Sequence, residues 1–255
     1  METCVTLGMV DEKQAKTLAE SGLTAYNHNI DTSREYYKHV ISTRNYDDRL
    51  ETIKNVQKAG IKACTGGILG LGETDEDHVG FLYTLSNMDP HPESLPINRL
   101  IAIKGTPIEE ELSKLPKDSK RHLKFDAILR TIATARILMP ESIIRFAAGR
   151  YTMKENEQMM CFMAGVNAIF TGEKMLTTMC NGWDEDKEML ARWGLRPMKS
   201  FSHIKHASVL EKQMAEKAKE NAEYMEKAAA EEQCGPNVAA VPENDAPVSG
   251  SRAQV

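Results

Sequence analysis

Short apolar runs alternate with longer stretches of helical hydrophobic spacing along most of this chain. The runs with the pattern of β-strands are residues 2–7, 24–29, 61–66, 95–103, 142–147 and 168–176. The segments with helical spacing are residues 11–21, 47–59, 75–88, 121–139 and 155–166. Asp11, Asp47 and Asp75 stand at helix starts, where carboxylates are favourable as caps or first-turn acids. Regular alternation of strands and helices predicts βαβ units around a parallel sheet, with the helices outside the strands.

The number of these units decides the architecture. Residues 1–204 provide six strand–helix units. A closed eight-unit barrel usually takes about 250 residues, with about 200 as its lower limit. The sequence also opens directly on an apolar strand, which would leave an unpaired sheet edge. We therefore expect an α/β fold of the TIM barrel type with six of the eight units and without the first two strands. An open doubly wound sheet is the alternative.

The composition changes after residue 204. Residues 205–230 are rich in Ala, Glu and Lys, which predicts a charged, solvated helix. Residues 231–255 are dominated by Gly, Pro, Asn and Ser, which predicts a disordered tail. Residues 1–204 should therefore form the folded body.

Charge and cysteine content exclude several classes of protein. The 255 residues carry a net charge of −5, which gives no electrostatic reason to expect nucleic acid as a partner. No apolar run approaches the length of a bilayer span, so we expect no membrane association. The five cysteines are odd in number and far apart, which is not the pattern of a disulfide framework and favours a reducing compartment.

Polar and sulfur-containing residues stand where the predicted strands end. They are Cys4, Asn27, Asn29, Asp31, Cys64, Asn98 and Arg145, with Thr177 and Thr178 after the last strand. In parallel β/α barrels the active site lies at this carboxyl edge. Alternation would place Asn27, Asn29 and Asp31 on one face, where they suit urea-like or hydroxyl ligands.

Each of these residues also has a purely structural explanation. The Asn/Asp segment could bond its own backbone as a turn, and the two cysteines could be small core residues. Arg145 could be an anion clamp or a salt-bridge partner. The glycines in residues 66–72 match neither the dinucleotide fingerprint nor a phosphate-binding loop. We further expect His28 to be a packed or surface histidine and not a catalyst, and Cys161 to lie in the core. The charge runs 109–111 and 184–187 should be solvated.

Taken together and in order, the segments resemble the biotin synthase family of radical S-adenosylmethionine enzymes. The matching stretches are CVTLG (4–8), YNHNIDT (26–32), GGILGLGET (66–74), PIN (96–98), KGTP (104–107), AAGR (147–150), MCFMAG (160–165) and LTT (176–178). Several are weak alone, but the ordered set is specific and covers roughly residues 1–200. The charged C-terminal segment is not covered.

The resemblance implies a defined chemistry. A four-iron cluster on a CxxxCxxC motif would cleave S-adenosylmethionine to a deoxyadenosyl radical, which removes hydrogen from dethiobiotin. Sulfur from a 2Fe–2S cluster would then close the ring of biotin. The resemblance also implies an electron donor such as a ferredoxin or flavodoxin and a homodimer when complete. The compartment would be cytoplasmic in a bacterium and mitochondrial in a eukaryote.

Individual residues acquire roles through the matching motifs. Ligands of the 2Fe–2S cluster would be Cys4, Cys64 and Arg145, three of the four required. Contacts to S-adenosylmethionine would be Asn29, Asp31, Ile68 and Ile101. Contacts to dethiobiotin would be Asn27, Asn29, Asn98, Thr177 and Thr178. The arginine assignment rests on the resemblance, because a protonated guanidinium is a poor metal ligand.

The sequence departs from the family in one respect. CxxxCxxC does not occur in the 255 residues, and the fourth ligand of the 2Fe–2S cluster is absent too. In the family both precede the position of Cys4, in agreement with the two missing units. We therefore expect an N-terminally truncated chain that does not cleave S-adenosylmethionine alone. The alternatives are another radical S-adenosylmethionine lyase or mutase and a non-catalytic module derived from the fold.

Overall fold

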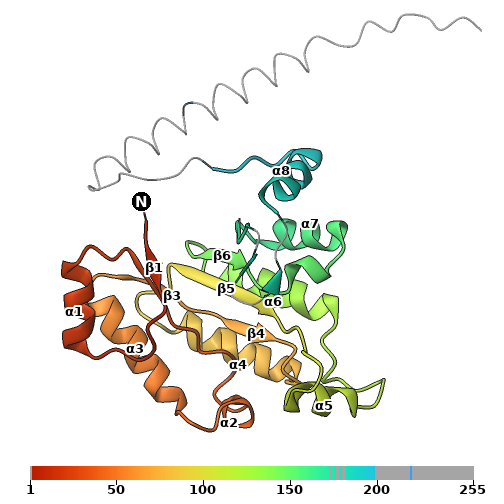
Figure 1. The fold of residues 1–255 in the computed structure, drawn as a ribbon, viewed down its shortest axis with the longest axis horizontal. Coiled ribbons are helices and arrows are strands. Elements are labelled where there is room, and N and C mark those ends of the chain that lie inside the picture. Colours follow the sequence, from red (N-terminus) through yellow and green to blue (C-terminus); the bar gives the residue numbers. More distant parts are fainter. Residues whose placement is uncertain (1, 173, 176–177, 180–181, 199–218, 220–255) are drawn as a thin grey trace, which may run out of the picture. The chain divides into compact units, whose positions relative to one another are not determined.

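A computed structural model describes residues 2–172, 174–175, 178–179, 182–198 and 219 (Figure 1). The chain divides into two compact units, Met1–Ser200 and Phe201–Val255. All elements named below belong to the first unit. The predicted helix 205–230 and tail 231–255 lie outside the described residues, apart from Lys219.

One parallel sheet organises the first unit. Its strands, in spatial order, are β1 (Cys4–Val5), β2 (Ala25–Asn27), β3 (Lys62–Cys64), β5 (Ser94–Arg99), β6 (Ile143–Phe146) and β7 (Ala168–Ile169). A further short strand, β4 (Gly67–Leu69), pairs with β5 beyond the end of β3. The spatial order follows the sequence order without the reversal that a doubly wound sheet requires. The strands therefore form part of a singly wound β/α barrel, which confirms the predicted fold class.

Helices connect the strands and pack on one another outside the sheet (Figure 1). They are α1 (Glu12–Glu20), α2 (Tyr37–Val40), α3 (Tyr46–Lys58), α4 (Asp75–Ser86), α5 (Pro107–Ser113), α6 (Phe125–Leu138), α7 (Glu155–Ala164) and α8 (Trp183–Arg192), with a 3-10 turn, η1 (Arg150–Thr152). Asp11 caps α1 as predicted, because its carboxylate accepts a hydrogen bond from Gln14 N at 2.7 Å. Asp47 and Asp75 lie in the first turns of α3 and α4.

The hydrophobic core lies between the sheet and these helices. Strand residues of the core include Leu95, Ile97, Ile144 and Phe146, which pack with helix residues such as Ile53, Leu85 and Ile132. Side chains alternate along a strand, so the residues between these core positions point to the other face. The helix-free face of β5 and β6 therefore receives Ser94 and Arg145.

The predicted final strand, 168–176, is wrong in extent. Only Ala168–Ile169 joins the parallel sheet, as β7. Gly172 follows with a φ of 144°, which favours glycine and interrupts the extended chain. Beyond it, β8 (Lys174–Met175) pairs antiparallel with β9 (Thr178–Met179). The sequence pattern also did not predict the short elements β4, α2, α5 and η1, or helix α8.

Candidate active site

Two cysteine thiols meet near one end of the sheet. Cys64 is buried at the end of β3, whereas Cys4 on β1 is exposed. The alternative explanation, that both cysteines are small core residues, does not hold for Cys4, because β1 is an end strand of the described sheet. A hydrogen bond from Cys4, assisted by Ser94 and Asn27, lowers the pKa of Cys64 to about 6 against the effect of burial. The same hydrogen bond and burial raise the pKa of Cys4. At neutral pH the pair is therefore a Cys64 thiolate beside a Cys4 thiol.

Arg145 approaches this pair from β6. Its Nε atom donates a long hydrogen bond of 3.4 Å to Ser94 Oγ, and Ser94 is the β5 partner of Cys64 in the sheet. The positive charge of Arg145 lowers the pKa of both thiols, although other contacts raise that of Cys4. The structure thus brings Cys4, Cys64 and Arg145 together.

The asparagines after β2 lie at the same edge. Asn27 Nδ2 donates a hydrogen bond to Cys64 Sγ at 3.5 Å. Asn29 Oδ1 accepts one from the backbone N–H of Gly66 at 3.0 Å. Asn29 therefore bonds the backbone of a different segment and not its own, as the structural explanation had proposed, while Asn27 contacts the thiol pair.

Asp31 is held by strand pairing and by an ion pair. It has a positive φ of 67° and forms a parallel bridge with Gly67. Its carboxylate Oδ2 lies 3.2 Å from Arg49 Nη2, and both side chains are largely buried. Burial raises the pKa of Asp31, while the charge of Arg49 opposes this effect. The carboxylate is thus fixed at the end of β2.

Asn98 uses both ends of its carboxamide on the backbone. Its Nδ2 donates to Gly67 O at 2.9 Å, and its Oδ1 accepts from Ala148 N at 3.1 Å. The side chain thereby joins β4 to the segment after β6. Ile68 and Ile101 are half-buried. Thr177 lies outside the described residues, and of Thr178 only the backbone, in β9, is described.

Two glycines let the segment from β3 to β4 pass close to β5 and to the residues after β2. A Cβ atom on Gly66 would lie 1.9 Å from the carbonyl oxygen of Pro96, and one on Gly67 would lie 2.5 Å from that of Asp31. Such distances are far below van der Waals contact, so only glycine fits. The glycine pair in the sequence therefore serves close backbone approach rather than phosphate binding.

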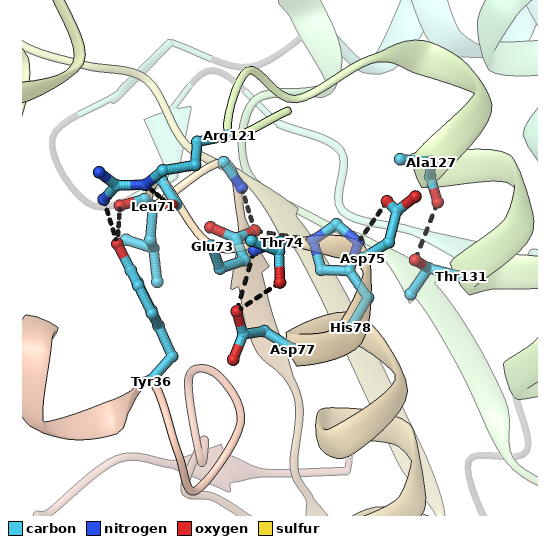
Figure 2. Close-up of polar contacts among 12 residues, drawn as sticks. Tyr36, Leu71, Glu73, Thr74, Asp75, Asp77, His78, Arg121, Ala127 and Thr131 are labelled. Carbon is cyan, nitrogen blue, oxygen red and sulfur yellow. Dashed lines mark hydrogen bonds and ion pairs between the residues drawn. The ribbon is translucent and has the colours of Figure 1, made fainter. Parts of the chain in front are cut away.

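Side chains from three segments hold the loop after β4 (Figure 2). Buried Glu73 accepts hydrogen bonds from Gly70 N at 2.6 Å and from His78 Nε2 at 2.8 Å. Tyr36 donates its hydroxyl to Leu71 O at 3.2 Å and accepts a hydrogen bond from Arg121 Nη2 at 2.9 Å. Arg121 Nε also donates to the carbonyl of Gly72. The loop that follows β4, the strand of Ile68, is thereby fixed from both sides.

A buried ion pair lies beyond β6 that the sequence did not reveal. Arg150 Nη2 lies 2.6 Å from Asp186 Oδ2, and the two side chains are only 4% and 2% exposed. The prediction that residues 184–187 form a solvated face is therefore wrong for Asp186. Opposite charges 36 residues apart carry no local pattern, which is why sequence inspection missed them. Cys161 is buried, as predicted, and of the two positions left open for His28 the structure shows the buried one.

The described residues set limits on metal binding and membrane insertion. Among them, no three His, Cys, Asp or Glu side chains are grouped to hold a metal ion. The donors that do converge are the two thiols, with Arg145 beside them. No helix within the described part of the chain is long and apolar enough to cross a membrane.

Two family models and several curated relatives match this chain. Residues 1–82 match the Radical SAM superfamily, and residues 96–196 match the Biotin and Thiamin Synthesis associated domain. Mitochondrial biotin synthase of Saccharomyces cerevisiae is 75% identical over 203 residues, which are 80% of this chain and 53% of that protein. Biotin synthase of Schizosaccharomyces pombe is 57% identical over 203 residues, which are 80% of this chain and 54% of that protein. The chain thus spans about half the length of these curated relatives.

Solved structures support the fold. Methylornithine synthase (PylB) superposes with a TM-score of 0.62 at 16% identity, covering 78% of this chain and 59% of the other. The hydrogenase maturase HydG gives a TM-score of 0.66 at 17% identity, covering 79% and 46%. At this identity the likeness concerns the fold alone. By its sequence relatives and the two matched regions, this chain is similar to biotin synthases and to the radical SAM superfamily.

Proposed function

We propose that the protein to which this chain belongs inserts sulfur into dethiobiotin to form biotin by a radical S-adenosylmethionine mechanism. The observation that carries the proposal is the meeting of Cys4, Cys64 and Arg145 at the edge where Asn27 also lies. A mutase or lyase has no need of sulfur-donor ligands at this place.

The residues fit an iron–sulfur group. Thiolates are the preferred ligands of such clusters, and a pKa of about 6 keeps Cys64 ionised at neutral pH. Arg145 would serve as a third ligand, which requires one nitrogen of its guanidinium to lose a proton when the cluster binds. When bound, the four-iron and two-iron clusters would supply the radical-forming electron and the sulfur, respectively. The CxxxCxxC motif does not occur in these 255 residues, so we propose the activity for the complete protein and not for this chain alone.

The side chains around the thiols would bind and orient the two organic molecules. Among the described residues, Asn27 Oδ1 has no hydrogen-bond donor, so it can accept an N–H of the ureido ring of dethiobiotin. Asn98 retains a second N–H for the same ring. We assign the substrate carboxylate to the hydroxyls of Thr177 and Thr178 on the strength of the family motif.

S-adenosylmethionine would occupy the adjacent part of the edge. The Nδ2 group of Asn29 has no acceptor within the described part of the chain, so it is available to this ligand. Asp31, which Arg49 fixes in place, would accept a hydrogen bond from S-adenosylmethionine. Ile68 and Ile101 would cover the nucleoside and help to exclude water.

Further features of the complete protein follow from the same proposal. We propose a ferredoxin or flavodoxin as electron donor and a homodimer as the assembled form. The relatives from Saccharomyces cerevisiae, Emericella nidulans and Arabidopsis thaliana carry the word mitochondrial in their names, which supports mitochondria as the compartment in a eukaryote.

The proposal is tested with protein expressed from the complete reading frame. Reconstituted with iron and sulfide and given S-adenosylmethionine, a reductant and dethiobiotin, it should form biotin. Cleavage of S-adenosylmethionine with unchanged dethiobiotin would instead assign the protein to another radical enzyme class.

A further inference from the structure

Phe170 lies directly after β7 and faces the guanidinium of Arg145. The Cζ atom of Arg145 is 5.0 Å from the centroid of the Phe170 ring, within the range of a cation–π contact. The ring is 36% exposed, so core packing does not account for its position.

Arg145 has few other restraints. Its Nε atom makes the long hydrogen bond to Ser94, and its two terminal nitrogens make no hydrogen bond or ion pair with any residue that the structure describes. An arginine side chain with one weak contact samples many rotamers. The flat face of Phe170 restricts these rotamers without occupying the hydrogen-bond donors of the terminal nitrogens.

The backbone of Phe170 is fixed by the buried side chain of Arg150. Arg150 Nη2 donates to Phe170 O at 3.0 Å, while Arg150 Nη1 contacts Asp186 Oδ1 at 2.7 Å and Gln158 Oε1 at 2.9 Å. These buried contacts connect the carbonyl to η1, α7 and α8. A bidentate arginine–carboxylate pair in this environment holds its geometry closely.

We propose that Phe170 is a positioning residue that holds the Arg145 guanidinium at the Cys4–Cys64 thiol pair, and that the Arg150–Asp186 ion pair holds Phe170 in turn. The inference rests on the proposed function for its purpose, which is to present a third ligand to the cluster. The contact between Phe170 and Arg145 is present without iron, so it can be measured in the iron-free chain. Displacement of the guanidinium would take a positive charge away from the thiol pair, so it should be detectable in the reactivity of Cys64.

The test follows alkylation of Cys64 by iodoacetamide in the iron-free 255-residue chain, with mass spectrometry to identify the modified peptide. The pH midpoint of the rate reports the charge near the thiol, and the high-pH plateau reports access to it. Phe170→Leu should raise the midpoint by about half a pKa unit, which lowers the rate about threefold at pH values well below the midpoint. Phe170→Tyr, which keeps the ring, should behave as wild type.

Arg145→Met provides the decisive comparison. It should raise the midpoint at least as far as Phe170→Leu does. In the double variant, Phe170→Leu should change the midpoint no further, because the ring acts through the guanidinium. An unmoved midpoint in Phe170→Leu, or a full additional shift in the double variant, would overturn the proposal. Tyr83→Leu, at an exposed aromatic on α4, is the matched control.

Two further conditions keep the result interpretable. If Phe170→Leu does not fold by its thermal melt, Phe170→Met replaces it with a side chain of similar volume. The assay contains no iron, S-adenosylmethionine or dethiobiotin, so failure of the proposed function would show in biotin formation and not in this measurement.

Discussion

The side-chain nitrogen of Asn27 lies 3.5 Å from the sulfur of Cys64, across a pair of residues in parallel register on β2 and β3. Asn27 is a proposed contact of the substrate, and Cys64 is a proposed ligand of the cluster. The hydrogen bond stabilises the thiolate, because an N–H donor favours the charged form. The two proposed subsites therefore share a boundary at these two residues.

Removal of the Cys4 thiol should make Cys64 less acidic. The hydrogen bond from Cys4 is the main cause of the lowered pKa, so Cys4→Ala should raise the pKa of Cys64 by about 1. The pH dependence of iodoacetamide alkylation measures this directly in the iron-free chain. Cys161→Ala, a substitution in the core, is the control. An unchanged midpoint in Cys4→Ala would show that the thiols do not interact.

Loss of the Asp186 carboxylate should destabilise the first unit. The partner would remain as a buried, uncompensated charge, so Asp186→Ala should lower the free energy of unfolding by about 3–5 kcal/mol. Urea denaturation monitored by circular dichroism gives the value. Glu12→Ala breaks the exposed pair with Lys58 and should cost under about 1 kcal/mol. Equal costs for the two substitutions would contradict the buried pair.

Sequence periodicity predicted the parts of the site that depend on local pattern. The end of each strand was recognisable, and parallel pairing then brings Asn27, Cys64 and Arg145 to one edge whatever the details of the loops. Motif resemblance supplied the roles proposed for them.

Other parts depend on tertiary contacts that have no local pattern. The ion pair of Arg150 with Asp186, the stacking of Phe170 on Arg145 and the exposure of Cys4 follow from how distant segments pack. The extended chain after β7 is interrupted at Gly172, which has a positive φ. The sequence did not indicate this, because the residues around Gly172 form a continuous apolar run. Pattern analysis therefore located the edge of the sheet but not the contacts that hold it.

Acid should destabilise the chain partly through His28. Burial, with the charges of Arg49 and Arg44, lowers the pKa of His28 from 6.5 to about 4. The unfolded chain then binds the proton more readily, so this contribution to stability is complete above pH 6.5 and is lost as the pH falls toward 4. We expect a loss of about 2 kcal/mol over that range.

Urea denaturation at several pH values tests this expectation. His28→Gln should reduce the pH dependence, whereas His91→Gln, at an exposed histidine, should leave it as in wild type. If both variants retain the wild-type slope, His28 is not buried in the neutral form.

A methyl group at Gly66 should not be tolerated. Because its Cβ would lie 1.9 Å from the carbonyl oxygen of Pro96, Gly66→Ala must displace β3 from β5. We expect a loss of unfolding free energy of about 3 kcal/mol or more by urea denaturation. Gly182→Ala is the matched control, since its Cβ would approach nothing closer than 3.9 Å and its φ is −61°. A small effect at Gly66 would mean that the two strands are not in close contact.

The central claim, that Cys4, Cys64 and Arg145 belong to one cluster site, is tested most directly by Mössbauer spectroscopy of the complete protein reconstituted with ⁵⁷Fe and sulfide. Cys64→Ala should lose the two-iron component and biotin formation while retaining the four-iron component, and Cys161→Ala should resemble wild type. A Cys64→Ala spectrum with an intact two-iron component would contradict the account.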